Sequence, residues 1–180
     1  LRRADSPLLY PWAVRALLQR GNLASLEALL DLRPPSPDLA GTRDAAAMAI
    51  AASLGTTDVL RTDDYVKGSA NAPLRLPLLQ AAWGSAMERT GSERKALARR
   101  IVPLLLDADR PTEALQLLES FDAAITQEDL LDLKFTSAIL AAAWSVAADV
   151  RPDSEAWMAQ WRLLREDDGQ AAEALFQQIT

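Results

Sequence analysis

The chain of 180 residues contains no His and no Cys, and these two absences exclude several kinds of chemistry. Without imidazole or thiol groups it has no Ser-His-Asp or Cys-His catalysis, no disulfide and no zinc site of the usual ligands. No Gly-rich phosphate loop replaces them, because the seven glycines are scattered. We therefore expect no catalytic residue, no metal and no cofactor.

Long apolar runs are also absent. The nearest to one, residues 135–148, is Ala-rich, contains three hydroxyl side chains and lies between Lys134 and Asp149. A membrane-spanning helix needs about 20 apolar residues, so we expect no transmembrane segment and interpret this stretch as a buried helix. The first residues lack the apolar core of a signal peptide. Because the chain begins with Leu1 instead of Met, we expect it to be part of a longer protein.

Lys is scarce as well, with three Lys against sixteen Arg in an Ala-rich chain, a usage typical of GC-rich bacterial genomes. The absence of Cys is compatible with the cytoplasm or the periplasm of a bacterium. The net charge of −6 combines a value of +3 for residues 1–110 with −9 for residues 111–180. The acidic part disfavours nucleic acid or an anionic membrane as partner, and its simplest interpretation is a solvated surface.

Ala and Leu are abundant, with 34 and 31 residues, and they recur at helical spacing between Pro and Gly. No segment alternates with the period of a strand, so we expect an all-α fold of about ten short helices. Their expected ranges are 11–20, 22–32, 43–54, 58–66, 77–89, 93–107, 111–121, 126–149, one helix from 152, and 170–179. We expect one helical domain over residues 1–180, with any internal break near residues 67–76.

Several residues define these helices. Pro11 suits a first helical position, Gly21 a C-terminal stop and Asn22 the N-cap of the next helix. In the first helix Val14, Leu17 and Leu18 are expected to face inward. The Ala-rich range 43–54 predicts close helix contacts and a central position. Pro103 predicts a kink in its helix, and a capping box at Thr126 is expected to open the longest helix.

Three helix junctions share one pattern, in which a Leu-Leu helix end is followed by a tight polar turn and then by Glu-Ala-Leu. The second parts are Glu27-Ala28-Leu29, Glu113-Ala114-Leu115 and Glu173-Ala174-Leu175. The pattern resembles the helix–turn–helix unit of tetratricopeptide-like α-solenoids. The resemblance implies antiparallel αα-hairpins whose first helices line a concave surface that binds a protein or peptide. A closed helical bundle built from αα-hairpins would produce the same pattern.

Two short motifs suggest chemistry, and both have simpler explanations. Ser92 and Lys95 match the Ser-x-x-Lys pattern of penicillin-binding enzymes, but the companion triplets of those enzymes are absent. We interpret Ser92 as a helix N-cap. Asp63 and Asp64 have no second acidic cluster to complete a metal site, and we interpret them as a solvated turn.

Two groups of residues are candidate partner-binding sites. Arg94, Lys95, Arg99 and Arg100 place four positive charges within seven residues. They would either bind an acidic peptide or phosphate or pair with the acidic C-terminal third. Trp157 and Trp161 share a helix face at i, i+4. With Trp144 they would belong either to the core or to an aromatic binding patch.

The sequence therefore favours a non-enzymatic protein-interaction or scaffold module that is part of a larger bacterial protein. The alternative is a helical bundle that binds a small hydrophobic ligand in a pocket walled by Trp83, Trp144, Trp157 and Trp161. An enzyme that uses Asp, Glu, Lys or Tyr alone is a third option. The sequence makes no prediction about the oligomeric state.

Overall fold

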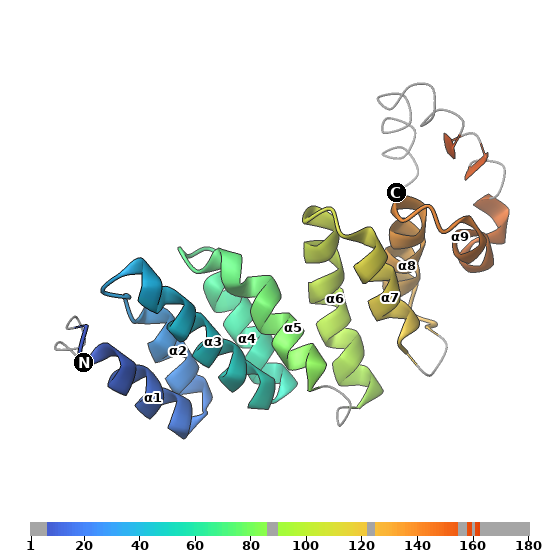
Figure 1. The fold of residues 1–180 in the computed structure, drawn as a ribbon. Helices are drawn as coiled ribbons and strands as arrows, with labels where there is room; N and C mark the ends of the chain where they lie inside the picture. Colours follow the sequence, from blue (N-terminus) through green and yellow to red (C-terminus); the bar gives the residue numbers. More distant parts are fainter. Residues whose placement is uncertain (1–6, 86–89, 122–124, 155–157, 160, 163–180) are drawn as a thin grey trace. The chain divides into compact units, whose positions relative to one another are not determined.

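The computed structural model describes residues 7–85, 90–121, 125–154, 158–159 and 161–162. This part of the chain is all-α, as expected, and forms nine α-helices without a strand (Figure 1). The helices are α1 (Tyr10–Arg20), α2 (Leu23–Asp31), α3 (Pro37–Ser53), α4 (Thr56–Val66), α5 (Arg75–Gly84), α6 (Gly91–Asp107), α7 (Pro111–Glu119), α8 (Glu128–Leu140) and α9 (Trp144–Val150), with the 3₁₀ helices η1 (Ala72–Leu74) and η3 (Pro152–Ser154).

The chain divides into two compact units, Leu1–Ile101 and Val102–Thr180. Residues 67–76, where an internal break was expected, lie inside the first unit between α4 and the start of α5 and include η1. The division between the units falls within α6, and this helix continues through Pro103.

The first unit has two helical layers. α1, α3 and α5 pack side by side in that order, and α2 and α4 contact one another in the second layer (Figure 1). α2 packs on α1 and α3, and α4 packs on α5. The expected central place of the Ala-rich segment is confirmed, since α3 contacts α1, α2 and α5 and buries Ala46, Ala47, Ile50 and Ala51.

The junction between α1 and α2 follows the local signals in the sequence. Gly21 adopts a left-handed conformation with φ 58°, and its N–H donates to the carbonyl of Leu17. Asn22 is the N-cap of α2, and its Oδ1 accepts from the backbone N–H of Ser25 at 2.9 Å. The predicted stop and cap are both confirmed.

The predicted starts of α3 and α6 are wrong. α3 begins at Pro37 instead of residue 43, because Pro37 follows the extended residue Ser36 and its fixed φ suits the first helical position. At the start of α6 the cap is made by Thr90 instead of Ser92. The Thr90 N–H donates to the Glu93 carboxylate at 3.0 Å, and the Glu93 N–H donates to Thr90 Oγ1 at 3.4 Å, as in a capping box.

In the second unit α8 packs on both α7 and α9. The core of the second unit consists of buried side chains from these helices and from the residues after η3, namely Leu115, Phe135, Ala138, Ile139, Ala147, Met158 and Trp161. Arg151, directly after α9, forms ion pairs with Glu128 and Asp132 and lies over the Phe135 ring at 5.4 Å. Part of the acidic C-terminal third is therefore internally paired.

The expected long helix over residues 126–149 is wrong, because α8 ends at Leu140 and α9 begins at Trp144. Ala142 between them has a left-handed φ of 55°. The N–H of Ala143 donates to the carbonyl of Ala138 at 2.8 Å, and that of Ala142 to Ile139 at 3.0 Å. This is a Schellman motif with Ala at the position where Gly is usual, so the sequence carried no stop signal. The expected cap at Thr126 is also wrong, since Gln127 is the N-cap and makes no capping bond.

Replacing Ala142 with Gly should raise the free energy of unfolding by about 0.5–1 kcal/mol. Gly relieves the strain of the left-handed conformation, and this gain exceeds the cost of the larger conformational entropy that Gly gives the unfolded chain. The matched change Ala141→Gly, at φ −80°, should lower it, because no strain is relieved there. Urea denaturation of both variants measures the difference. Equal losses at both positions would contradict the role assigned to Ala142.

Candidate functional site

Large apolar side chains are exposed in one short segment at the start of the first unit. Leu8, Leu9, Trp12 and Leu18 are 82%, 48%, 69% and 40% exposed. The only other large apolar or aromatic side chain exposed among the described residues is Tyr65, which donates a hydrogen bond to Asp31 at 2.6 Å. Clustered exposed apolar side chains are characteristic of interaction sites, whereas scattered ones need no explanation.

A groove of about 570 Å³ lies between α1 and α3, beside this segment. The α1 residues that line it share one helix face: Pro11, Val14, Arg15 and Leu18. The α3 residues that line it are small: Gly41, Thr42, Ala45, Ala46 and Ala49. The expectation that Leu18 faces inward is wrong, because it lies at this open groove. The two helices belong to the same layer, whose other side is covered by α2.

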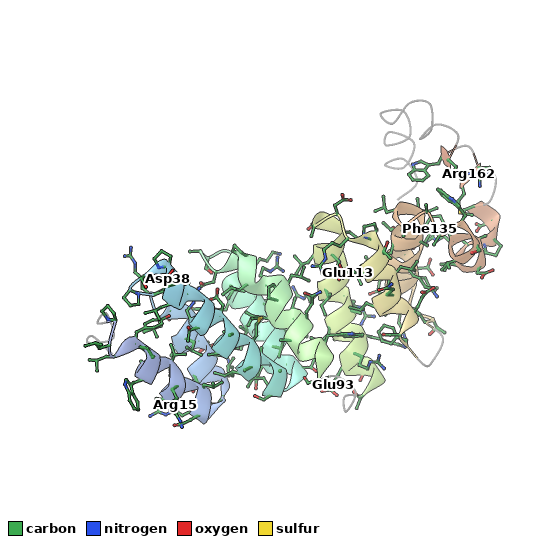
Figure 2. The ribbon with its side chains drawn as sticks, in the orientation of Figure 1. Arg15, Asp38, Glu93, Glu113, Phe135 and Arg162 are labelled. Carbon is green, nitrogen blue, oxygen red and sulfur yellow. The ribbon has the colours of Figure 1, made fainter. Side chains whose placement is uncertain are left out.

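The charged side chains on the α1 side of the groove are all basic. Arg15, which projects from α1 (Figure 2), is the only charged side chain of the lining, and it has no ion pair with the described residues. α1 contains Arg15 and Arg20 but no acidic residue. By contrast, Arg43 on α3 pairs with Asp44 at 2.7 Å. Within the described part of the chain, the groove therefore offers apolar contact and one guanidinium that has no ion pair.

Tyr10, at the start of α1, is fully buried, and its hydroxyl has no hydrogen-bond partner in the described part of the chain. Burial raises the pKa of this phenol; the charge of Arg43 opposes the rise and that of Asp44 adds to it. A buried hydroxyl without a partner loses its hydration without compensation.

We expect Tyr10→Phe to stabilise the fold by about 1 kcal/mol, since it removes the unsatisfied hydroxyl. Because the pKa of Tyr10 is raised in the folded state, its titration does not affect stability below the ordinary tyrosine pKa of about 10, and it lowers the free energy of unfolding as pH rises above that value. The loss of stability between pH 10 and 11 should therefore be smaller in Tyr10→Phe than in the parent. Tyr65→Phe, which removes a bonded hydroxyl, is the control and should not be stabilised. Thermal unfolding across this pH range provides the measurement.

The predicted basic cluster lies on α6 and is partly internally paired. The Arg94 guanidinium lies over the Trp83 ring at 5.1 Å, and Arg100 pairs with Asp64 at 3.1 Å. Lys95 is partly exposed and Arg99 is exposed. The partners found for Arg100 lie on α4 of the first unit, not in the acidic C-terminal third.

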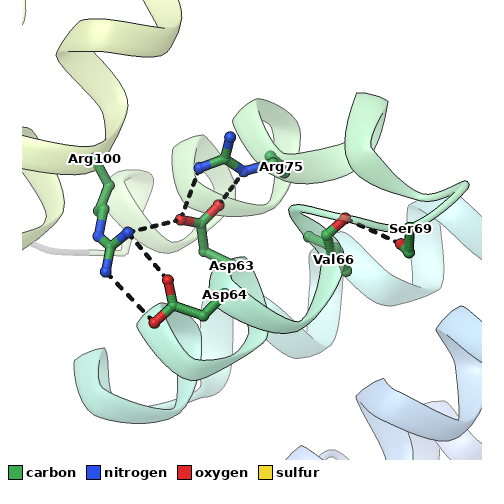
Figure 3. Close-up of polar contacts among 6 residues, drawn as sticks. All are labelled: Asp63, Asp64, Val66, Ser69, Arg75 and Arg100. Carbon is green, nitrogen blue, oxygen red and sulfur yellow. Dashed lines mark hydrogen bonds and ion pairs between the residues drawn. The ribbon is translucent and has the colours of Figure 1, made fainter.

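Asp63 is the centre of a charged network (Figure 3). It is 2% exposed and accepts two bonds from Arg75, Nε to Oδ1 at 2.7 Å and Nη2 to Oδ2 at 3.1 Å. Arg100 lies 3.7 Å from Asp63 Oδ2. The interpretation of Asp63 and Asp64 as a solvated turn is wrong, because both lie in α4 and only Asp64 is exposed, its side chain at 59%.

The four tryptophans of the alternative pocket are divided between the two units. Trp83 belongs to the first unit, while Trp144 and Trp161 of the second pack with ring centroids 5.5 Å apart. Trp161 is buried in the core, and Trp157 lies outside the described residues. A cavity of about 350 Å³ is lined by Trp144, Ser145, Ala148, Met158, Ala159 and Arg162.

No protein-family model, curated protein or solved structure matches this chain. Among the described residues no group of three or more acidic side chains comes together as a metal site. The helices in the same part of the chain are too short or too polar to cross a membrane.

Sequence reasoning missed the groove, although two signals for it exist. α1 contains no acidic residue in a chain rich in acids. From residue 41 to the end of α3 the exposed positions are Gly41, Thr42, Ala45, Ala49 and Ser53, and none of them is charged. A solvent-facing helix stripe usually carries charged residues, so an uncharged one indicates a contact surface.

Proposed function

We propose that the chain is a non-enzymatic protein-interaction module and that a partner protein docks on the first-layer helices at the groove between α1 and α3. The observation that carries the proposal is the apolar groove lined by the exposed Leu18, in a segment that also exposes Leu8, Leu9 and Trp12. In protein–protein interfaces a few residues near an apolar centre, often Trp, Tyr or Arg, contribute most of the binding energy.

The helix arrangement of the first unit supports the proposal. Successive first-layer helices α1, α3 and α5 lie side by side, with α2 and α4 in the second layer. Such an arrangement is compatible with a tetratricopeptide-like α-solenoid, in which first helices line the binding surface. The apolar groove supports docking on physical grounds that do not depend on the fold.

The test compares partner capture by three versions of the chain. Ala45→Glu places a charge in the groove at an exposed helical position, and Thr57→Glu adds the same charge at an exposed position of α4. From lysate of the cells that encode the chain, the parent and Thr57→Glu should retain one protein that Ala45→Glu retains roughly tenfold less. Equal retention by all three would contradict the proposal, provided that circular dichroism shows all three folded.

The second unit supports a second candidate function, the binding of a small aromatic anion. The cavity beside α9 has the Trp144 ring as one wall, and the Arg162 guanidinium lies 6.0 Å from that ring. An aromatic carboxylate would gain stacking from the ring and charge pairing from the guanidinium. Calorimetric titration with indole-3-acetate tests this. Saturable binding that Ala148→Phe abolishes would support it, and no heat of binding would exclude this ligand class.

A further inference from the structure

The groove between α1 and α3 has the dimensions of a docking site for a helix. Its α1 wall contains Pro11, Val14, Arg15 and Leu18, which span about 10 Å at 1.5 Å per residue. Helical ligands bind in grooves through apolar anchors at i, i+3 or i+4, and i+7, which span the same length. An extended strand would instead require unpaired backbone groups to bond with, and a helix wall offers none.

The α3 side of the groove permits close approach of another helix. Gly41, Ala45 and Ala49 lie at i, i+4 and i+8, so they form one smooth stripe along the helix. A Cβ added at Gly41 would meet no atom within 4 Å, so the space above it is open. The axes of packed helices lie about 8–10 Å apart, and the distance is shortest where the contacting side chains are small. This stripe provides such a surface.

The charges at the groove indicate which charge a partner segment should carry. Arg15 is the only charged lining residue and has no ion pair with the described residues, and α1 contains no acid. Arg20 lies on the same helix, while the acid Asp38 lies one turn before Thr42 and outside the lining. A partner with an acidic side chain facing Arg15 would gain a charge-assisted bond, and a basic one would be repelled.

We infer that the partner segment is an acidic amphipathic helix, with an apolar stripe that fills the groove and an Asp or Glu that pairs with Arg15. This inference rests on the proposed function and specifies the class of partner. Leu8, Leu9 and Trp12 of the same segment are exposed as well.

The test uses a displayed library of amphipathic helices about 16 residues long, long enough for the helical state to be appreciable. Apolar positions are drawn from Leu, Ile, Val, Met and Ala, and positions flanking the stripe from Glu, Lys, Gln and Ser. Selection on the parent chain should enrich Glu beside the stripe. A selected peptide should bind Arg15→Glu roughly tenfold more weakly and Arg20→Glu nearly as well as the parent. Selection on Arg15→Glu should instead enrich Lys.

The outcomes separate this inference from the proposed function. Enrichment of apolar helices without a preference for Glu would overturn the acidic partner while leaving the docking site. Failure to enrich any helix, with partner capture still sensitive to Ala45→Glu, would overturn the helical partner alone. Binding of the parent, but not Trp12→Ala, to phosphatidylglycerol vesicles would identify a lipid surface as the occupant and overturn the inference.

Discussion

Replacing Asp63 with Ala is expected to lower the free energy of unfolding by about 3–5 kcal/mol, the largest effect of any single change considered. The carboxylate is buried and receives two bonds from Arg75. Its removal takes two hydrogen bonds from the Arg75 guanidinium, whose side chain is 17% exposed. Removing one member of a buried ion pair costs far more than an exposed ion pair contributes. Chemical denaturation at neutral pH measures the loss.

Asp64→Ala is the matched control, because it removes the neighbouring carboxylate of the same helix, whose side chain is 59% exposed. It should change the stability by less than about 1 kcal/mol. The double variant Asp63→Leu with Arg75→Met removes both charges and should recover most of the loss, since a buried ion pair replaced by apolar groups is often neutral. Equal losses for Asp63→Ala and Asp64→Ala would refute the central role of Asp63.

The second large effect is expected in α3, where Ala47→Leu should lower the free energy of unfolding by about 2–3 kcal/mol. Ala47 is fully buried in the helix that α1, α2 and α5 all contact. Added methylene groups would force these helices apart, because protein interiors are close-packed. Urea denaturation with the slope of the transition recorded tests both the loss and its cooperativity.

Ala49→Leu adds the same atoms to the same helix at an exposed position of the groove. It should leave the stability within about 0.5 kcal/mol of the parent while reducing the open volume of the groove. If both variants lost equal stability, the Ala-rich stripe would not divide into a packed face and an open face.

The elements whose boundaries depend on backbone chemistry were predictable from the sequence. Gly21 and Asn22 act through their own φ preference and side-chain oxygen, so the junction between α1 and α2 could be predicted from two residues. The same holds for Pro111 at the start of α7. The end of α8 was not predictable, because Ala142 has no local preference for the left-handed conformation that it adopts.

The groove and the charged network depend on contacts between distant residues, which composition and spacing do not specify. Asp63 and Arg75 are twelve residues apart, and Asp64 and Arg100 thirty-six. Leu18 has the spacing of an inward residue, yet the position of α3 leaves it exposed. Residue type and spacing predicted a basic cluster of Arg94, Lys95, Arg99 and Arg100 and an aromatic site that includes Trp161. The structure places Trp161 in the core.

The position of α6 has a consequence for how the chain can be dissected. Domain boundaries normally fall in exposed linkers, where a cut leaves both parts intact. Here the division at residues 101 and 102 falls inside a helix, one residue before a proline that supplies no N–H to the helical ladder. A cut at this boundary would break the backbone hydrogen bonds that join the two halves of α6, and the residues Val102 and Leu105 just beyond it are buried. Neither unit can therefore be excised at this boundary without dividing a helix.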